Sequence, residues 1–141
     1  MIKCDGWYSL VGETIFKVFL VGAGGFAGSV LRYLFSGYVQ NVSGSIGFPY
    51  GTLAVNLAGC FVIGLLSHLA DVRGVFSPDA RAFVFIGILG GFTTFSTFGN
   101  ETMNLLRDGE NASAMLNIGG HVVAGLFFVW VGRTIAYLIW G

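Results

Sequence analysis

Charged residues are scarce in this sequence, and cysteine and proline are scarcer still. Only 10% of the 141 residues are Asp, Glu, Lys or Arg, whereas soluble domains carry about 25%. Seven basic residues balance seven acidic ones, so no basic surface for nucleic acid is indicated. Cys4 and Cys60 form neither a CxxC pair nor a metal-ligand spacing. The composition therefore argues against a soluble domain, a nucleic-acid-binding protein and a cysteine-ligated metal protein.

Apolar residues make up 55% of the chain, and 23 residues are glycine. A membrane helix needs about 20 apolar residues, and four such segments occur, at about 15–39, 51–70, 80–103 and 112–139. We therefore expect an all-α, multi-pass protein of the cell (inner or plasma) membrane, with residues 15–141 forming one four-helix domain. Residues 1–14 lack the apolar core and cleavage site of a signal peptide. They contain Trp7 and Tyr8, which predict a lead-in at the membrane interface.

The third span is interrupted by polar residues at its centre. Residues 90–101 read Gly-Gly-Phe-Thr-Thr-Phe-Ser-Thr-Phe-Gly-Asn-Glu. A broken helix survives at membrane depth only where protein or a water-filled cavity satisfies its backbone. We predict two half-helices that meet near residues 90–94, with Phe95 and Phe98 on one face of the second half because they stand three apart. The alternative is an unbroken, kinked helix whose small and hydroxyl residues serve packing.

Polar side chains also lie within or near the ends of the spans. They are Arg32, Thr52, Asn56, Glu101, Asn117 and His121. An amide in hydrocarbon needs partners, so Asn56 either joins helices or donates to a permeating anion. An intramembrane histidine such as His121 is more often a hydrogen-bonded packing residue than a proton relay, although its cost in lipid points to function. Arg32 either extends to the interface or faces a polar vestibule.

The sequence contains no recognisable enzyme motif. It has no nucleophile–base set in a hydrolase context, no paired carboxylates at mid-span and no phosphate-binding glycine loop. Its intramembrane donors are mostly neutral, and neutral donors at several depths allow an anion both to enter and to leave. Aromatic rings carry a positive edge, so two phenylalanines on a narrow path could stabilise an anion. These residues alone do not separate an anion path from packing.

The third-span motif resembles the signature of the Fluc (CrcB-type) fluoride channels. The similarity extends to Gly24–Tyr33, which resembles the first helix of that family with its arginine. It also covers Pro49–Gly59, which resembles the start of the second helix with its asparagine, and residues 121–132 of the fourth span. The family implies a passive channel that exports fluoride from the cytoplasm and relieves its toxicity. It also implies an antiparallel, dual-topology dimer with two pores, in which the third helix is broken.

The resemblance implies roles for individual residues. Phe95 and Phe98 would coordinate fluoride by their ring edges, and Asn56 would be the amide donor of the second helix. The remaining predicted members of the anion pathway are Thr52, Ser96, Thr97, Arg32, Asn117, His121 and Glu101. The backbone carbonyls of Gly90 and Thr93 would hold a structural Na⁺ at the dimer interface. Asn117 and Gly125 depart from the family, which often carries Ser or Tyr on this face of the fourth helix.

Three other functions remain open at this stage. A small multidrug exporter would need a carboxylate buried in the first span, but the only candidate, Glu13, precedes it. A non-transporting assembly subunit would use the glycine motifs for helix contacts alone. A fluoride/proton antiporter would couple flux to a pH gradient. The distribution of Lys and Arg favours both termini in the cytoplasm. If the chain inserts mainly in this one orientation, an antiparallel dimer needs a different chain of opposite orientation, so a heterodimer is the alternative to a homodimer.

Overall fold

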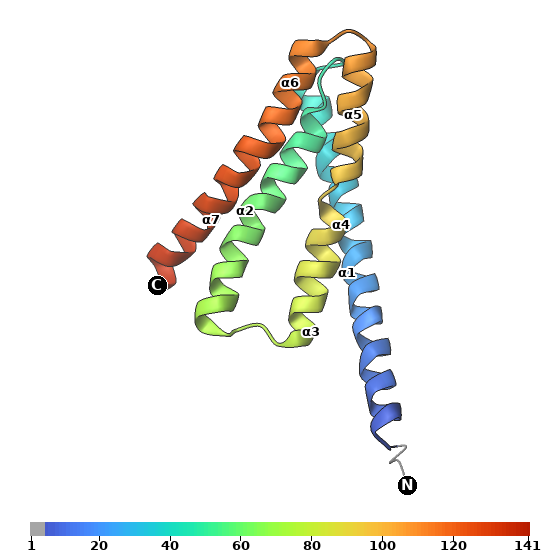
Figure 1. Cartoon of the computed structure of the whole chain (residues 1–141), viewed down its shortest axis with the longest axis vertical. Coiled ribbons are helices and arrows are strands. Elements are labelled where there is room, and N and C mark those ends of the chain that lie inside the picture. The colour runs from blue at the N-terminus through green and yellow to red at the C-terminus, as the bar shows by residue number, and fades with distance from the viewer. Residues whose placement is uncertain (1–4) are drawn as a thin grey trace.

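The computed structural model describes residues 5–141, all of its regular structure being helical in that range. The helices in chain order are α1 (Asp5–Ser43), α2 (Tyr50–Arg73), α3 (Pro78–Arg81), the π-wound segment η1 (Ala82–Leu89), α4 (Gly90–Phe92), α5 (Phe95–Arg107), α6 (Asn111–Gly119), the π-wound segment η2 (Gly120–Ala124) and α7 (Gly125–Trp140). Several of these run on without a gap, so the chain makes four long helices (Figure 1).

Each long helix is long and apolar enough to cross a membrane. They comprise residues Leu10–Ser43, Tyr50–Arg73, Pro78–Arg107 and Asn111–Trp140. The expectation of an all-α, multi-pass membrane protein with four spans is thus confirmed. Helix α1 begins at Asp5, so the described part of the expected lead-in is helical and continuous with the first span. The first four residues of that lead-in lie outside the described range.

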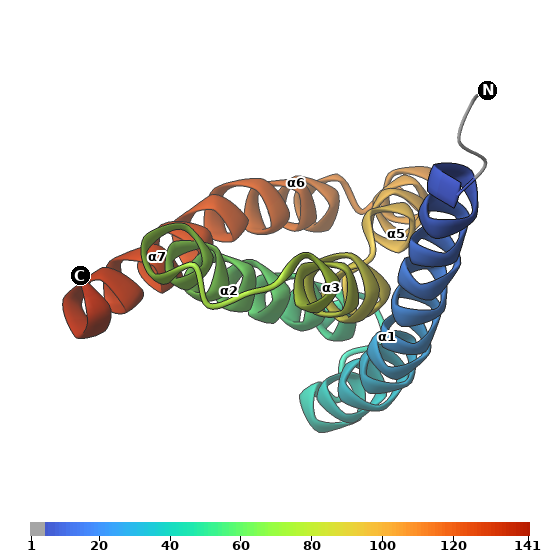
Figure 2. The same cartoon turned by 90° about the horizontal axis from the view of Figure 1, so that it is seen from below.

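The third span is broken, as the sequence predicted. It runs through α3, η1 and α4, stops at Thr93 and Thr94, and resumes as α5. In Figure 1 this break lies about midway along the bundle, between the labels α4 and α5. Figure 2 shows α1 on one flank of the molecule and α7 on the other, with α2 and α3 between them. The break therefore lies inside the bundle and not at an end.

Glycines set the close crossing between α1 and the first half of the third span. A Cβ on Gly24 would lie 2.5 Å from the carbonyl oxygen of Phe83, and one on Gly91 would lie 2.6 Å from that of Gly25. A Cβ on Gly28 would collide with the Ile88 carbonyl. The sequence expectation that Gly24 and Gly28 allow close backbone approach is confirmed.

The other main contact joins α2 to α7, which run side by side (Figure 1). Gly132 permits this approach, because a Cβ there would lie 2.8 Å from the backbone nitrogen of Leu65. At the opposite end of the bundle, Gln40 fixes the α1–α2 loop: its Nε2 donates to the carbonyls of Ser45 (2.6 Å) and Phe48 (3.1 Å). These contacts hold α2 in place to receive the broken third helix.

Candidate functional site

The break in the third helix consists of two extended residues. Thr93 has φ −82° and ψ 159°, and Thr94 has φ −151° and ψ 108°. The N–H of Thr93 still reaches the carbonyl of Leu89 (3.0 Å), which completes the preceding helical turn. The N–H of Thr94 turns away and donates instead to Oδ1 of Asn56 on α2 (2.8 Å). A side chain from a neighbouring helix thus replaces the helical bond that is lost at the break.

Asn56 satisfies both backbone groups of Thr94. Besides the bond at Oδ1, its Nδ2 donates to the Thr94 carbonyl at 3.0 Å. A primary amide carries two N–H donors, so one remains after this bond. Asn56 therefore joins the helices, which was one interpretation of the sequence, and it still has a donor for another group, as the second interpretation requires.

Helix α5 starts from a hydroxyl cap. The side chain of Thr94 accepts from the N–H of Thr97 at 3.3 Å and lies 2.8 Å from the Thr97 hydroxyl. Such a cap replaces one of the missing bonds of the first helical turn. Because the Thr97 N–H bonds to this cap, it is not available to the carbonyl of Thr93, four residues earlier. In the same way, the Thr94 N–H bonds to Asn56 and is not available to the carbonyl of Gly90. Nη1 of Arg32 approaches the Thr93 carbonyl from α1, at the long distance of 3.5 Å.

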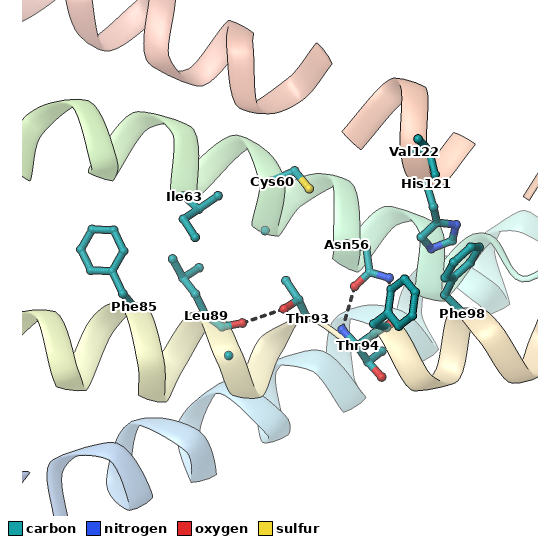
Figure 3. Close-up of a pocket in the computed structure, with 13 residues that line it drawn as sticks. Asn56, Cys60, Ile63, Phe85, Leu89, Thr93, Thr94, Phe98, His121 and Val122 are labelled. Carbon is teal, nitrogen blue, oxygen red and sulfur yellow. Dashed lines mark hydrogen bonds between the residues drawn. The ribbon is translucent and has the colours of Figure 1, made fainter. Parts of the chain in front are cut away.

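A cavity of about 360 Å³ opens beside the break. One end is apolar, where Phe85, Ile63 and Leu89 lie, and the other is formed by Asn56, Phe98 and His121 (Figure 3). None of its described lining residues is Asp, Glu, Lys or Arg. The cavity is therefore lined by neutral donors and aromatic rings, which suits a group that must be both bound and released.

Two aromatic contacts define the polar end of this cavity. The rings of Phe95 and Phe98 have centroids 5.4 Å apart and an interplanar angle of 62°, an edge-type arrangement. The His121 ring lies 4.2 Å from that of Phe98 with an angle of 30°. Phe98 is only 8% exposed, whereas Phe95 is 83% exposed. The two rings thus share one site, but in this single chain only Phe98 is enclosed by protein.

Buried hydrogen bonds hold the backbone around Phe98. The Thr102 hydroxyl donates to the Phe98 carbonyl at 2.8 Å and accepts from Nδ2 of Asn117 at 2.9 Å. Asn117 is fully buried. Its backbone carbonyl contacts Nδ1 of His121 at 2.9 Å. The fourth helix is therefore linked to both the backbone and the ring of Phe98.

A second cavity, of about 400 Å³, lies beyond Phe98 towards the α5–α6 loop. The Thr52 hydroxyl donates to Oε1 of Glu101 at 2.6 Å on its wall. Asp108 and Glu110 also line this cavity. Its polar and acidic lining suits a water-filled mouth, in contrast to the neutral cavity at the break.

Comparison with known proteins places this arrangement in a family. The family model described as "CrcB-like protein, Camphor Resistance (CrcB)" matches residues 19–133. The chain belongs to the CrcB family. The match covers the broken helix and both cavities.

Several curated CrcB relatives carry the name fluoride-specific ion channel FluC. The relative from Chlorobaculum tepidum is 50% identical over 86% of this chain and 95% of its own length. The relative from Elusimicrobium minutum is 48% identical over 87% and 95%, respectively. A FluC 3 from Methanosarcina barkeri is 42% identical over 86% and 91%. The similarity to CrcB proteins therefore extends over nearly the whole of each relative.

The structure brings some of the predicted pathway residues together. Asn56, Phe95, Phe98 and His121 line the cavity at the break, and Thr52 and Glu101 line the second one. The other predicted members lie outside both cavities: Arg32 reaches the break from α1, Asn117 lies buried behind Phe98, and Ser96 and Thr97 are exposed. Their place on an anion path in this CrcB protein stays a prediction.

Sequence reasoning did not single out Thr94 or Thr102 as site residues. Thr94 is buried and holds both sides of the break together. A signal for it was present, because a threonine directly before a helical segment is typical of a helix cap. Thr102 stands four residues after Phe98, where a hydroxyl can reach the carbonyl of the preceding turn. Nothing in the sequence indicated that Asn117 would complete that contact.

Proposed function

We propose that the chain forms a passive, fluoride-selective channel that lets fluoride leave the cytoplasm and so relieves its toxicity. The names of relatives that match nearly the whole chain support this function, and ion channels are not enzymes. The structural observation that carries it is the Phe95–Phe98 ring pair beside a helix break stabilised by Asn56. Packing alone does not require a broken helix at that position.

The chemistry of the cavity fits a small, strongly hydrated anion. Ring edges and a spare amide N–H offer positive partial charge without a fixed cation. A fixed cation would hold the anion too firmly, whereas neutral groups at several sites permit both binding and release. We propose that fluoride passes the ring edges of Phe95 and Phe98 and the amide of Asn56. The hydroxyls of Thr52, Ser96 and Thr97 and the carboxylate of Glu101 line the route to the mouth, and Arg32 serves a vestibule.

We propose that the working unit is an antiparallel homodimer in lipid, with two pores. Phe95, Ser96 and Thr97 are all exposed at mid-span in the single chain. Exposed polar side chains are costly in lipid. The Ser96 and Thr97 hydroxyls reach only the Thr94 hydroxyl within the chain, so cover by a second subunit is the simplest way to shield them. A related chain of opposite orientation in place of the second copy is the alternative that the topology bias favours.

A structural Na⁺ at the subunit interface is part of this proposal. The break leaves the carbonyls of Gly90 and Thr93 without their helical donors, since Thr94 donates to Asn56 and Thr97 to the Thr94 hydroxyl. Unwound backbone carbonyls suit Na⁺, and two copies of the break would double the number of oxygens. The residues therefore fit the ion, which would supply charge to oxygens that have lost their helical donors.

The test is fluoride release from liposomes that contain the purified protein, measured with a fluoride electrode and valinomycin. We expect rapid fluoride release without chloride release. In Phe95→Ile and Phe98→Ile proteins we expect at least about tenfold slower release, which corresponds to about 1.4 kcal/mol of barrier. Folded, dimeric wild-type protein that releases no fluoride would contradict the homodimeric channel. Full release by both variants would favour a packing role for the rings.

A further inference from the structure

His121 occupies a position that the fluoride pathway does not by itself explain. It lies in η2, a π-wound turn between α6 and α7, and such turns within α-helices occur frequently at functional sites. Its ring stacks on Phe98 and lines the cavity at the break (Figure 3). An imidazole is thus in contact with the ring proposed to bind the anion.

The hydrogen bond to Asn117 decides which nitrogen of the neutral ring carries the proton. Nδ1 lies 2.9 Å from the Asn117 carbonyl oxygen, and a carbonyl can only accept. Nδ1 must therefore be the donor, which leaves Nε2 of the neutral imidazole as an acceptor. Nε2 is buried and has no hydrogen-bond partner within residues 10–141. The neutral ring thus offers the cavity the negative end of a dipole.

Protonation reverses the sign of the partial charge at Nε2 of His121. In the imidazolium both nitrogens are donors, so Nε2–H becomes available to an anion while the bond to Asn117 is kept. A cation within about 6 Å of an aromatic centroid is also attracted to the ring face, and the 4.2 Å spacing to Phe98 meets that condition. One proton therefore changes an acceptor into a donor beside Phe98.

We propose that His121 makes anion conduction depend on pH, the imidazolium admitting the anion past Phe98 and the neutral ring opposing it. This inference rests on the proposed fluoride pathway and adds a regulatory residue to it. The chemistry requires an anion that binds an N–H donor, with no proton carried across the membrane.

Few other ionisable groups lie close enough to substitute for His121. From α2, the Cys60 thiol lines the same cavity. From α5, Glu101 lies one turn beyond Phe98 with its carboxylate bonded to Thr52 in the second cavity. From α1, Arg32 reaches the Thr93 carbonyl. Among the described lining residues of the cavity at the break, His121 is the one whose protonation introduces a positive charge.

The experiment measures fluoride release from liposomes with the same pH on both sides, from about pH 8 to about pH 5, where histidine titrates. Protein-free liposomes report leakage of the neutral acid at each pH. We expect wild-type release to rise at least about tenfold towards the acidic end. With the same pH on both sides the fluoride gradient alone drives release, and an antiporter would acidify the liposome interior as fluoride leaves, whereas a channel would not.

Two substitutions of His121 and one of the other intramembrane histidine sharpen the test. His121→Gln keeps an N–H donor at every pH, so we expect fast release without pH dependence. His121→Phe has no donor, so we expect slow release throughout. His68→Gln is the matched control: the His68 ring meets the Tyr137 ring edge-on outside the cavity, and its variant should keep the wild-type pH profile.

The outcomes separate the inference from the function on which it rests. Strong fluoride release that does not change with pH would overturn the role of His121 and leave the channel intact. A pH profile that survives in His121→Gln or disappears in His68→Gln would overturn it as well. Absence of fluoride release at every pH from dimeric protein would refute the channel, and the inference with it.

Discussion

The two halves of the third span are held by different interactions. The first half, residues 78–92, lies against α1 through glycines, with backbone atoms in close contact, and makes a side-chain bond to α2 only at its start, from Arg81 to the Ala70 carbonyl. The second half, α5, is held by side-chain hydrogen bonds to α2 and α6. Steric fit therefore fixes the half before the break, and polar pairing fixes the half after it. The break lies where these two modes meet, and Asn56 joins them.

This difference explains why only the second half carries candidate pathway side chains. The first half contributes only apolar side chains and Gly90 to the cavity at the break, whereas α5 lies between both cavities and contributes Phe98 to one and Glu101 to the other. Hydrogen bonds orient side chains without filling volume, so they can hold a ring at the edge of an open space. Selective damage to each half would test this division.

The largest effect should come from filling the glycine contact of the first half. In Gly24→Ala the new Cβ would meet the Phe83 carbonyl at 2.5 Å, and overpacking of this kind costs about 1–3 kcal/mol. Thermal unfolding in detergent should report the loss, with a lower unfolding temperature than wild type.

Gly22→Ala is the matched control for that substitution. A Cβ on Gly22 has nothing within 4 Å, and alanine is the better helix former by about 1 kcal/mol. This variant should unfold at or above the wild-type temperature. Equal destabilisation by both variants would mean that helix propensity, and not the crossing with the third span, determines the stability of α1.

A smaller effect should follow from removing one hydrogen bond of the second half. Asn117→Ala and Thr102→Val each break the bond between these two side chains, which is 2.9 Å long and buried. A net hydrogen bond contributes about 1 kcal/mol, so a double-mutant cycle should give a coupling of about that size. Unfolding of the two single variants and the double variant supplies the cycle.

Ser113→Ala serves as the control in this part of the molecule. Its hydroxyl reaches Glu110 only at 3.5 Å and in an exposed place, so its coupling to Thr102→Val should be zero within error. A coupling near zero for the Asn117 pair too would contradict the idea that polar pairing holds α5.

Much of the fold was predictable from the sequence, because long apolar segments in a membrane protein of this composition form spanning helices. Four apolar segments predicted four spans, and glycines with hydroxyl residues predicted the break within residues 90–94. The clustering of Asn56 and His121 around Phe98 was harder to predict, because it depends on how α2 and the fourth helix rotate about their axes. Apolar residues cover every face of these helices, so no hydrophobic stripe reports that rotation. The resemblance to Fluc channels, and not periodicity, linked Asn56 with Phe98.

The pairing of Asn117 with Thr102 shows the same limit. Asn117 is a polar residue in a mostly apolar helix and Thr102 is one of several polar residues in α5, fifteen positions away. Their contact requires the short connection between α5 and α6 to set one particular axial register between the two helices. The distance is fixed by the loop at Gly109, which has a φ of 80° that other residues rarely adopt. A glycine there indicates a turn but not the register of the two helices.

The smallest effect should come from the exposed end of α5, which is held neither by close glycine contacts nor by buried side-chain hydrogen bonds. Asp108 pairs with Arg107 at 3.5 Å, and both side chains are more than half exposed. Exposed ion pairs contribute about 0.2–1 kcal/mol, so Asp108→Asn should hardly change the unfolding temperature.

The same substitution should affect conduction, because Asp108 lines the acidic second cavity. Removing this negative charge should raise fluoride release by about twofold at an ionic strength of about 0.01 M, where charges act over about 30 Å. The difference should disappear at about 1 M salt, where they act over about 3 Å. A gain that persists at high salt would instead mean that Asp108 acts on the conformation of α5. Polar interactions would then hold the exposed end of this helix as well as its buried part.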